Sequence, residues 1–270
     1  MYKAHYKKYN LQFKVPSGTS RGVLKEKESW FLQITNTDNS KNGLGECSII
    51  RGLSYDDTPD YESTLDWLCD NINSDLDYLY QKLQKFPSIS FGLNSALLDL
   101  QHNGNGILFP SDFSEAKSSI LINGLIWMGS FDFMKSQIEE KIQKGFNCIK
   151  IKIGSIDFEE EIKILKFIRT EYKKENIELR VDANGAFTFP DVFEKLKQLS
   201  EFNLHSIEQP IKTRQWENMA EVCEKSPIPI ALDEELIGIF ELSEKQNLLE
   251  TIKPNYIILK PSMLGKFDVC

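Results

Sequence analysis

Five ionisable residues follow one another in the second half of the sequence at intervals of 30, 26, 25 and 27 positions. Each stands at the end of a short apolar-rich stretch or directly after it. They are Lys152, Asp182, Glu208, Asp233 and Lys260. Carboxylates in such a set can bind a metal ion, and a neutral lysine can take a proton from carbon. The spacing therefore predicts an acid–base site that also holds a metal.

The three carboxylates, Asp182, Glu208 and Asp233, predict a site for Mg²⁺. Carboxylates that lie together repel one another, which raises their pKa values unless a cation neutralises them. Ligands that are all oxygen suit a hard ion such as Mg²⁺, and neither His nor Cys stands at these positions. Taken singly, Asp182 in "DANG" is also a turn former, and Asp233 in "LDEE" could be a helix N-cap. Local structure explains one such residue easily, but not three at matching strand ends.

The lysines predict a proton transfer. A dication bound to a substrate carboxylate stabilises the enediolate that forms when the α-proton leaves. Lys152 must be neutral to take that proton, and both the neighbouring Lys150 and the dication would lower its pKa. Lys260 is expected on the other side of the substrate, either as a second acid or base or as a fixed cation that supports the intermediate.

Residues 118–270 alternate between strand and helix patterns, which predicts right-handed βαβ units and a parallel sheet. The expected strands are 119–126, 147–153, 177–182, 204–208, 228–232 and 256–260. The expected helices are about 131–144, 157–173, 189–200, 214–224 and 240–250. A doubly wound sheet and a (β/α)8 barrel both fit this order. No GxGxxG follows the first strand, which weakens the dinucleotide-binding version.

The polar residues of these strands share one face, because side chains alternate between the two faces of a strand. In "NCIKIKIG" Lys150 and Lys152 alternate with isoleucines, and Arg180 shares the face of Asp182. Since the apolar face would meet the helices, the polar face is expected to line the interior or mouth of a barrel. The alternative, an edge strand with solvated lysines, does not fit a central parallel strand. In an eight-stranded barrel, Lys152 and Lys260 would face each other across the mouth.

Residues 1–115 follow a different pattern, which predicts an α+β domain ahead of a barrel domain at 116–270. Two alternating segments flank the loop "PSGTSRG" at 16–22, and "GLGECSII" at 43–50 predicts a third strand. An antiparallel meander is the simplest arrangement of these strands. Two helical patterns follow, at about 59–85 and 90–102.

Composition excludes several classes of function. The 270 residues carry a net charge of −8, which disfavours nucleic acid and anionic membranes as partners. No window approaches about 18 uninterrupted apolar residues, and the N-terminus lacks an apolar core of signal-peptide length. The five scattered cysteines form no CxxC pair, which indicates reduced thiols and a cytoplasmic protein. The expected partner is a small-molecule carboxylate, and the oligomeric state is left open.

Five motifs carry a resemblance to a known family. They are "IKIKIG", "RVDANGAF", "SIEQP", "ALDEE" and "ILKPSMLG". Together with "GLGEC" at about residue 43, their order and spacing resemble the muconate-lactonising subgroup of the enolase superfamily. The resemblance implies an α+β capping domain and a modified (β/α) barrel, with the three carboxylates on Mg²⁺. It also implies Lys152 and Lys260 as the acid–base lysines, Lys150 as the first lysine of a KxK motif, and Asn184 beside the metal. A lysine base with an Mg²⁺-stabilised enediolate is the general description of such sites.

Within the subgroup, "SILINGLIWMG" and "RVDANGAF" resemble most the o-succinylbenzoate synthases of the Bacteroidetes type. That resemblance implies dehydration of 2-succinyl-6-hydroxy-2,4-cyclohexadiene-1-carboxylate in menaquinone biosynthesis. A dipeptide epimerase or N-acylamino-acid racemase is the alternative, with both lysines exchanging protons on opposite faces of one carbon. Arg21, in a loop expected to cover the substrate, is a candidate for meeting a carboxylate, although exposed arginines are commonly just solvated. Ser262 could meet the succinyl carboxylate, or could cap a helix or turn.

The expected barrel is incomplete in this sequence. Eight units starting at residue 119 would need roughly 60 residues more than the chain supplies. We therefore expect the last strands of the barrel to be missing and the edges of the first and sixth strands to be exposed. A truncated, non-catalytic protein that retains the motifs is the third interpretation of the sequence.

Overall fold

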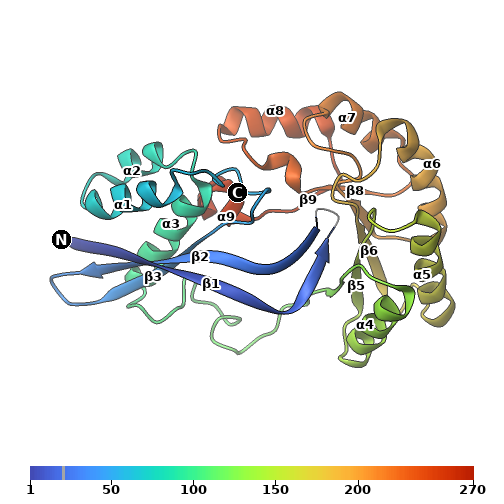
Figure 1. Ribbon diagram of the computed structural model, residues 1–270, viewed down its shortest axis with the longest axis horizontal. Coiled ribbons are helices and arrows are strands. Elements are labelled where there is room, and N and C mark those ends of the chain that lie inside the picture. The colour runs from blue at the N-terminus through green and yellow to red at the C-terminus, as the bar shows by residue number, and fades with distance from the viewer. Residues whose placement is uncertain (20–21) are drawn as a thin grey trace.

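The computed structural model describes residues 1–19 and 22–270 and contains two sheets (Figure 1). The first is an antiparallel sheet of order β1-β2-β3. Its strands are β1 (Tyr2–Thr19), β2 (Gly22–Asn36) and β3 (Asn42–Ser48). Three helices accompany it, α1 (Tyr61–Asp70), α2 (Leu76–Lys82) and α3 (Pro87–Gln101). The predicted meander followed by helices is confirmed.

One face of this sheet is apolar because β2 alternates buried and less buried residues. Trp30, Leu32 and Ile34 are fully buried and face the helices. Helix α3 packs very closely on β3, since a Cβ atom built on Gly45 would stand 1.9 Å from the carbonyl oxygen of Gly92. Only glycine therefore permits this contact, and it fixes the helix against the sheet.

Two local expectations for this half are wrong. The loop predicted at 16–22 is largely strand, because β1 and β2 form a ribbon that extends to Thr19 and Gly22. The single helix predicted at 59–85 is two helices, α1 and α2. A second N-terminus separates them at Asp75, whose carboxylate accepts hydrogen bonds from the backbone N–H groups of Asp77 and Tyr78.

The second sheet is parallel and has the order β4-β5-β6-β7-β8-β9. Its strands are β4 (Gly124–Ile126), β5 (Cys148–Lys152), β6 (Glu178–Asp182), β7 (Ser206–Glu208), β8 (Ile230–Leu232) and β9 (Tyr256–Ile257). Its helices are α4 (Phe131–Gln143), α5 (Phe158–Glu171), α6 (Phe189–Leu199), α7 (Trp216–Lys225), α8 (Leu242–Ile252) and α9 (Pro261–Leu264). Short 3-10 turns are η1 (Ser200–Phe202), η2 (Glu234–Leu236) and η3 (Phe267–Val269).

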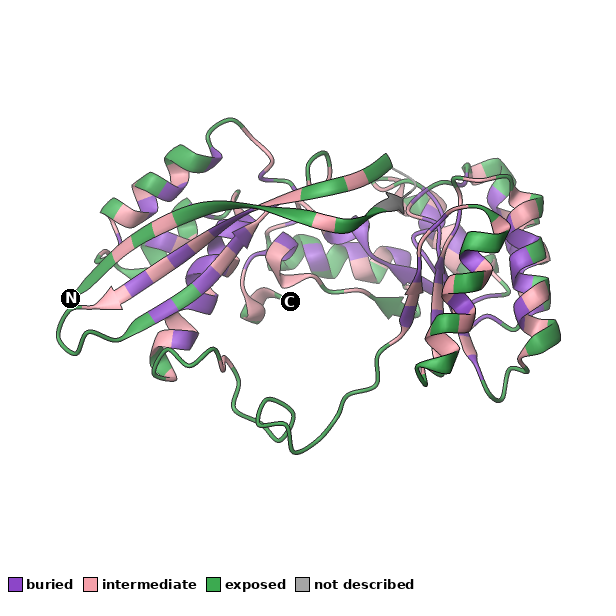
Figure 2. Cartoon of the chain, turned by 60° about the horizontal axis from the view of Figure 1, so that its bottom comes forward, coloured by how far each residue is buried: buried purple, intermediate pink, exposed green. Residues whose placement is uncertain are grey.

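Helices α4 to α8 cover one face of the parallel sheet, and the other face looks towards the β1–β2 ribbon (Figure 1). The covered face is the core, and Figure 2 shows it as a continuous buried layer between strands and helices. Ile149 and Ile151 are buried there, whereas the alternating Lys150 and Lys152 lie on the opposite face. Because β5 lies between β4 and β6, these lysines belong to an interior strand.

The outer strands are shorter than expected. Of the predicted strand 119–126 only β4 forms, since its partner β5 begins at Cys148 and Gly124 already pairs with Ile149. Residues before Gly124 therefore have little of β5 to pair with, and Leu121 is exposed. At the other edge, β9 ends at Ile257, and Lys260 instead precedes the first turn of α9.

The two halves have separate hydrophobic cores, one ending at Ala96 and the other beginning at Ile126. The domain boundary predicted at 115/116 falls in the segment between them. Helix α9 leaves the parallel sheet and packs against α3 of the first half (Figure 1). The five cysteines, all in the described part of the chain, are free thiols. Among the described residues, the helices are too short or too polar for one to cross a membrane.

Candidate active site

A cavity of about 340 Å³ opens where the carboxyl ends of the parallel strands meet the first sheet. Its polar lining residues from the second half of the chain are Lys150, Lys152, Asp182, Asn184, Glu208, Asp233 and Lys260. The remaining lining residues come from both halves of the chain, and they are Gly22, Val23, Leu24, Ile50, Arg51, Leu53, Leu125, Trp127 and Met263. The five ionisable residues singled out at the strand ends thus share one cavity with Lys150, and the cavity has largely apolar walls.

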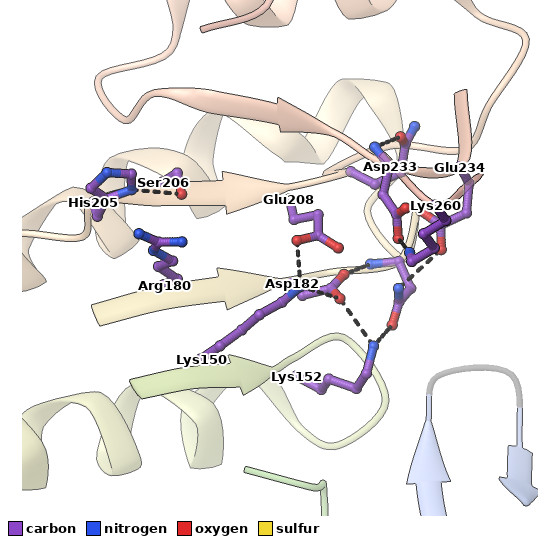
Figure 3. A network of polar contacts seen from close by, with 12 residues as sticks. Lys150, Lys152, Arg180, Asp182, His205, Ser206, Glu208, Asp233, Glu234 and Lys260 are labelled. Carbon is purple, nitrogen blue, oxygen red and sulfur yellow. Dashed lines mark hydrogen bonds and ion pairs between the residues drawn. The ribbon is translucent and has the colours of Figure 1, made fainter. Parts of the chain in front are cut away.

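Strand register places these side chains. In the parallel ladder Lys152 pairs with Asp182, and Asp182 pairs with Glu208 (Figure 3). Glu208 pairs with Ala231, so Asp233 stands one step further along the same face of β8. All three carboxylates are buried, with 2% exposure at Asp182 and 5% at Glu208 and Asp233.

Lys150 neutralises two of these carboxylates. Its Nζ donates a hydrogen bond to Glu208 and lies 3.4 Å from Asp182 Oδ2. Burial alone would lower the pKa of Lys150, but the charges of Asp182 and Glu208 outweigh it and raise the pKa. Lys150 therefore stays protonated and acts as a fixed positive charge under the site.

The two paired carboxylates respond differently to their surroundings. Burial acts to raise the pKa of Asp182, but Lys150 and Lys152 lower it below its ordinary value. Burial raises the pKa of Glu208 to about 8, and the nearby charge of Asp182 adds to the shift. The contact with Lys150 therefore does not fully offset the effects of burial and of Asp182 on Glu208.

Lys152 is held by two hydrogen bonds. Its Nζ donates to Asp182 Oδ2 at 3.0 Å and to Asn184 Oδ1 at 2.8 Å. The amide of Asn184 donates in turn to Glu234 Oε1 at 3.0 Å, and its backbone N–H donates to Asp182 Oδ1 at 3.0 Å. Asn184 has a left-handed φ of 46°, which turns the chain back over the strand end. Glu234, the residue after Asp233 in "LDEE", was missed in the sequence although it stands in the quoted motif.

Lys260, which directly precedes α9, contacts Asp233, which directly follows β8. The Nζ of Lys260 donates to Asp233 Oδ2 (Figure 3). The backbone N–H of Asp233 donates to Gln209 Oε1 at 3.2 Å, so Gln209 links the end of β7 to the end of β8. Lys152 and Lys260 therefore serve different carboxylates, on β6 and after β8 respectively.

Two predicted residues that the structure describes do not line this cavity. Among the described residues, Arg180 and Ser262 are not in its lining. Arg180 lies nearer the beginning of its strand than Asp182 does (Figure 3). Its Nε donates to Glu178 Oε1 at 2.7 Å. Ser262 is in the first turn of α9, and Arg21 falls outside the described residues. Arg51 and Trp127 line the cavity and were not predicted. Arg51 comes from the loop after β3, whereas Trp127 directly follows β4 and was missed because only ionisable residues were sought at the strand ends.

The donor set suits a hard dication, although it is not arranged as a ready metal site. Within the described part of the chain, no three His, Cys, Asp or Glu side chains gather closely enough to hold an ion. Each of the three carboxylates contacts a lysine ammonium instead. Their oxygen-only chemistry and burial nevertheless fit Mg²⁺, which would relieve the repulsion that raises the pKa of Glu208.

This fold and this site define a member of the enolase superfamily. The family model described as "Enolase C-terminal domain-like" matches residues 134–249. Beyond that match, the chain is 41% identical to the o-succinylbenzoate synthase of Desulfotalea psychrophila over 97% of its own length and 79% of that protein. The chain belongs to the o-succinylbenzoate synthase family.

Two further comparisons place the chain within the superfamily. The crystal structure of MenC from Desulfotalea psychrophila LSv54 superimposes with a TM-score of 0.87 at 37% identity, covering 99% of this chain and 80% of that one. An L-amino acid-D/L-Glu epimerase of Francisella philomiragia is 25% identical over 70% of this chain and 52% of that protein. The predicted fold class and family are confirmed, and epimerases are the more distant relatives.

Proposed function

We propose that the chain removes water from 2-succinyl-6-hydroxy-2,4-cyclohexadiene-1-carboxylate to form o-succinylbenzoate. The observation that carries this proposal is the cavity in which Lys152 and Lys260 meet three buried carboxylates, in a chain of this family. The apolar walls around Leu53 and Trp127 suit a six-membered carbon ring. The free thiols and net charge of −8 support the further proposal of a cytoplasmic enzyme.

Lys152 supplies the base. Its Nζ accepts the proton from the ring carbon that carries the carboxylate. The C–H electron pair passes towards that carboxylate and then forms the ring double bond to the carbon that bears the hydroxyl. The C–O bond of the ring hydroxyl then breaks, the same Nζ returns its proton to the departing oxygen, and water leaves while the ring becomes aromatic. Asp182 and Asn184 hold that Nζ at the strand end, which aims it during both transfers.

Mg²⁺ is proposed as the cofactor, held by Asp182, Glu208 and Asp233. When bound, it neutralises these carboxylates and withdraws negative charge from the substrate carboxylate during proton removal. Lys150 remains as a fixed cation beneath Glu208. Lys260, which contacts Asp233, supplies a second positive charge towards the ring as negative charge develops.

Turnover of the cyclohexadiene substrate by the purified chain tests this proposal. We expect o-succinylbenzoate to form with Mg²⁺, to stop forming with EDTA, and to fall at least about 10³-fold in Lys152→Ala. Lys163→Ala is a matched control, because Lys163 is an exposed lysine on α5. Product formation that persists undiminished in Lys152→Ala would refute the assignment of the base.

The epimerase alternative has its own readout. A dipeptide epimerase exchanges the α-hydrogen of L-Ala-D/L-Glu with solvent, so incubation in D₂O would incorporate deuterium at that carbon. We expect no incorporation under conditions that give dehydration. Deuterated dipeptide without formation of o-succinylbenzoate would favour epimerisation instead.

A further inference from the structure

Arg51 is a cation of the cavity lining that comes from the first half of the chain. It follows β3, in the first half of the chain, and it lines the cavity together with Ile50 and Leu53. Its side chain is 56% exposed, so it remains accessible to a ligand. The guanidinium is carried by a loop, while the lysines of the cavity are carried by the parallel sheet and the turn that follows it.

The lysines of the parallel sheet are committed to the reacting end of the cavity. Lys150, Lys152 and Lys260 each contact at least one of the carboxylates that we propose as metal ligands. A substrate with a single carboxylate needs nothing more. A substrate with a second carboxylate, several bonds away, has to place that group against another part of the lining, and Arg51 offers positive charge there.

Two carboxylates hold the guanidinium of Arg51 and leave two of its N–H groups for a ligand. Its Nε donates to Glu28 Oε2 at 2.6 Å, and its Nη2 contacts the same carboxylate. Its Nη1 donates to Asp57 Oδ1 at 2.5 Å. Each terminal nitrogen carries two N–H groups, and the contacts with Glu28 and Asp57 engage one on each. Each therefore keeps one N–H that can donate to an oxygen of a ligand carboxylate.

The two carboxylates beside Arg51 are each paired with a cation. Lys8 lies 2.7 Å from Glu28 Oε1, so two cations face Glu28 and Asp57. Lys8 also donates to Glu62 of α1, so the cluster holds two cations and three carboxylates. An incoming carboxylate at Arg51 therefore meets a cluster in which the nearest negative charges are already paired.

Hydrogen bonds hold the loop that carries Arg51. The backbone N–H of Gly52 donates to Asp57 Oδ2 at 2.8 Å, and that of Ile50 donates to the hydroxyl of Ser54 at 2.9 Å. Asp56 is fully buried and accepts two hydrogen bonds from Ser88 at the start of α3, at 2.8 Å from N and 2.6 Å from Oγ. Binding at Arg51 would cost little conformational entropy because its support is already in place.

The loop also touches the barrel half near the metal-ligand strand. The ring of Tyr55 packs edge-on against Phe240 with centroids 4.8 Å apart, and a Cβ atom on Gly238 would stand 2.6 Å from the Tyr55 ring. Gly238 follows Asp233 by five positions. The wall that holds Arg51 is therefore fixed relative to the segment that holds one of the carboxylates.

We propose that Arg51 binds the carboxylate remote from the reacting carbon, and so selects cyclic substrates that carry two carboxylates. This inference rests on the proposed function and assigns the remote subsite, for which the sequence had suggested Arg21 or Ser262. One carboxylate of the substrate lies at the strand ends, the ring lies against the apolar walls, and the succinyl carboxylate meets the remaining N–H groups of the guanidinium.

Calorimetric binding of two ligands in the presence of Mg²⁺ tests this subsite. The probes are o-succinylbenzoate and 2-butyrylbenzoate, which lacks the remote carboxylate. We expect the unchanged chain to prefer the first by about 10-fold or more, and Arg51→Gln to lose that preference while binding the second equally well. Arg51→Lys, which keeps the charge without the fork, should restore only part of it.

Two controls separate recognition from side effects. Lys8→Gln removes a cation from the same Glu28 but not from the cavity, and should keep the preference. In Arg51→Gln the carboxylate of Asp57 loses its partner and could repel the ligand. The double variant Arg51→Gln/Asp57→Asn removes that negative charge as well, so a loss of the preference in the double variant comes from the missing guanidinium. Equal binding of both ligands by the unchanged chain, or a preference retained in Arg51→Gln, overturns the inference. Absent turnover would overturn the proposed function, and the binding comparison would still decide the role of Arg51.

Discussion

Lys152 and Asn184 are joined by a hydrogen bond of 2.8 Å between Nζ and Oδ1. The two residues stand on neighbouring strand ends, 32 positions apart in the sequence. Because Asn184 also donates to Glu234 at 3.0 Å, this bond links the proposed base to the segment after β8. Asn184 therefore determines where the amine of Lys152 points.

Replacing Asn184 should impair the chemical step more than substrate binding. Asn184→Ala removes one of two partners of Lys152 and lets the amine swing, so we expect kcat to fall about 10- to 100-fold with a KM within about 3-fold of the original. Steady-state kinetics measures both constants. A KM that rises while kcat stays constant would show that Asn184 contacts substrate rather than positions the base.

Metal binding should depend on Glu208. Glu208→Gln keeps the shape of the side chain but removes an anionic ligand, so we expect Mg²⁺ affinity to fall at least about 100-fold, with activity following metal occupancy. Titration calorimetry with Mg²⁺ measures the affinity directly. Glu178→Gln is the matched control, since Glu178 belongs to the same sheet but pairs with Arg180 away from the cavity. Equal affinities in Glu208→Gln and the control would exclude Glu208 as a ligand.

The rim of the parallel sheet was predictable because its geometry is repetitive. Pairing between adjacent parallel strands places Lys152, Asp182 and Glu208 side by side. The alternation of side chains along each strand and the regular length of the βα units were therefore enough to identify these residues in the sequence. The same rule predicts the position of Lys260 less accurately, because β9 already ends at Ile257. The turn before α9, rather than a strand, positions Lys260.

The part of the cavity lining that comes from the first half of the chain was not predictable from local patterns. Arg51 reaches the cavity through the docking of the first half on the second, and no periodicity in the sequence records that contact. Glu234 was missed for a different reason, since it follows the strand and its direction depends on the turn η2. Arg180 shows the converse, because it shares a face with Asp182 but lies too far down the strand to line the cavity.

Glu161 should make stability depend on pH. Burial raises its pKa to about 7, although the backbone N–H of Gly154 donates to its Oε1 at 2.5 Å. The unfolded chain releases this proton near pH 4.5, whereas the folded chain keeps it until about pH 7. Unfolding therefore releases a proton within this window, and the free energy of unfolding falls as the pH rises through it, by about 2–3 kcal/mol.

Urea unfolding of the chain and of Glu161→Gln at pH 5 and pH 8 measures this effect. The glutamine keeps an acceptor for Gly154 but has no proton to lose, so the variant should gain about 2–3 kcal/mol relative to the unchanged chain between the two pH values. Other titrating groups are present in both proteins and cancel in the difference. A difference that is the same at both pH values would mean that Glu161 titrates normally.

Gln209 should be important for stability, because its amide joins three segments at the strand ends. Its Nε2 donates to Glu235 Oε2 at 2.9 Å and to the carbonyl of Ile211 at 3.1 Å, while its Oε1 accepts from Asp233 N. Both Gln209 and Glu235 are 1% exposed, so water cannot replace these bonds.

Gln209→Ala should therefore lower the free energy of unfolding by about 2–4 kcal/mol, since it leaves a buried carboxylate with fewer donors. Chemical denaturation measures the loss. Gln215→Ala is a suitable control, because the Gln215 amide donates to the Lys212 carbonyl near the surface and its removal should cost less than about 0.5 kcal/mol. If the two variants lose the same stability, the amide of Gln209 does not join the ends of β7 and β8 in the way its contacts indicate.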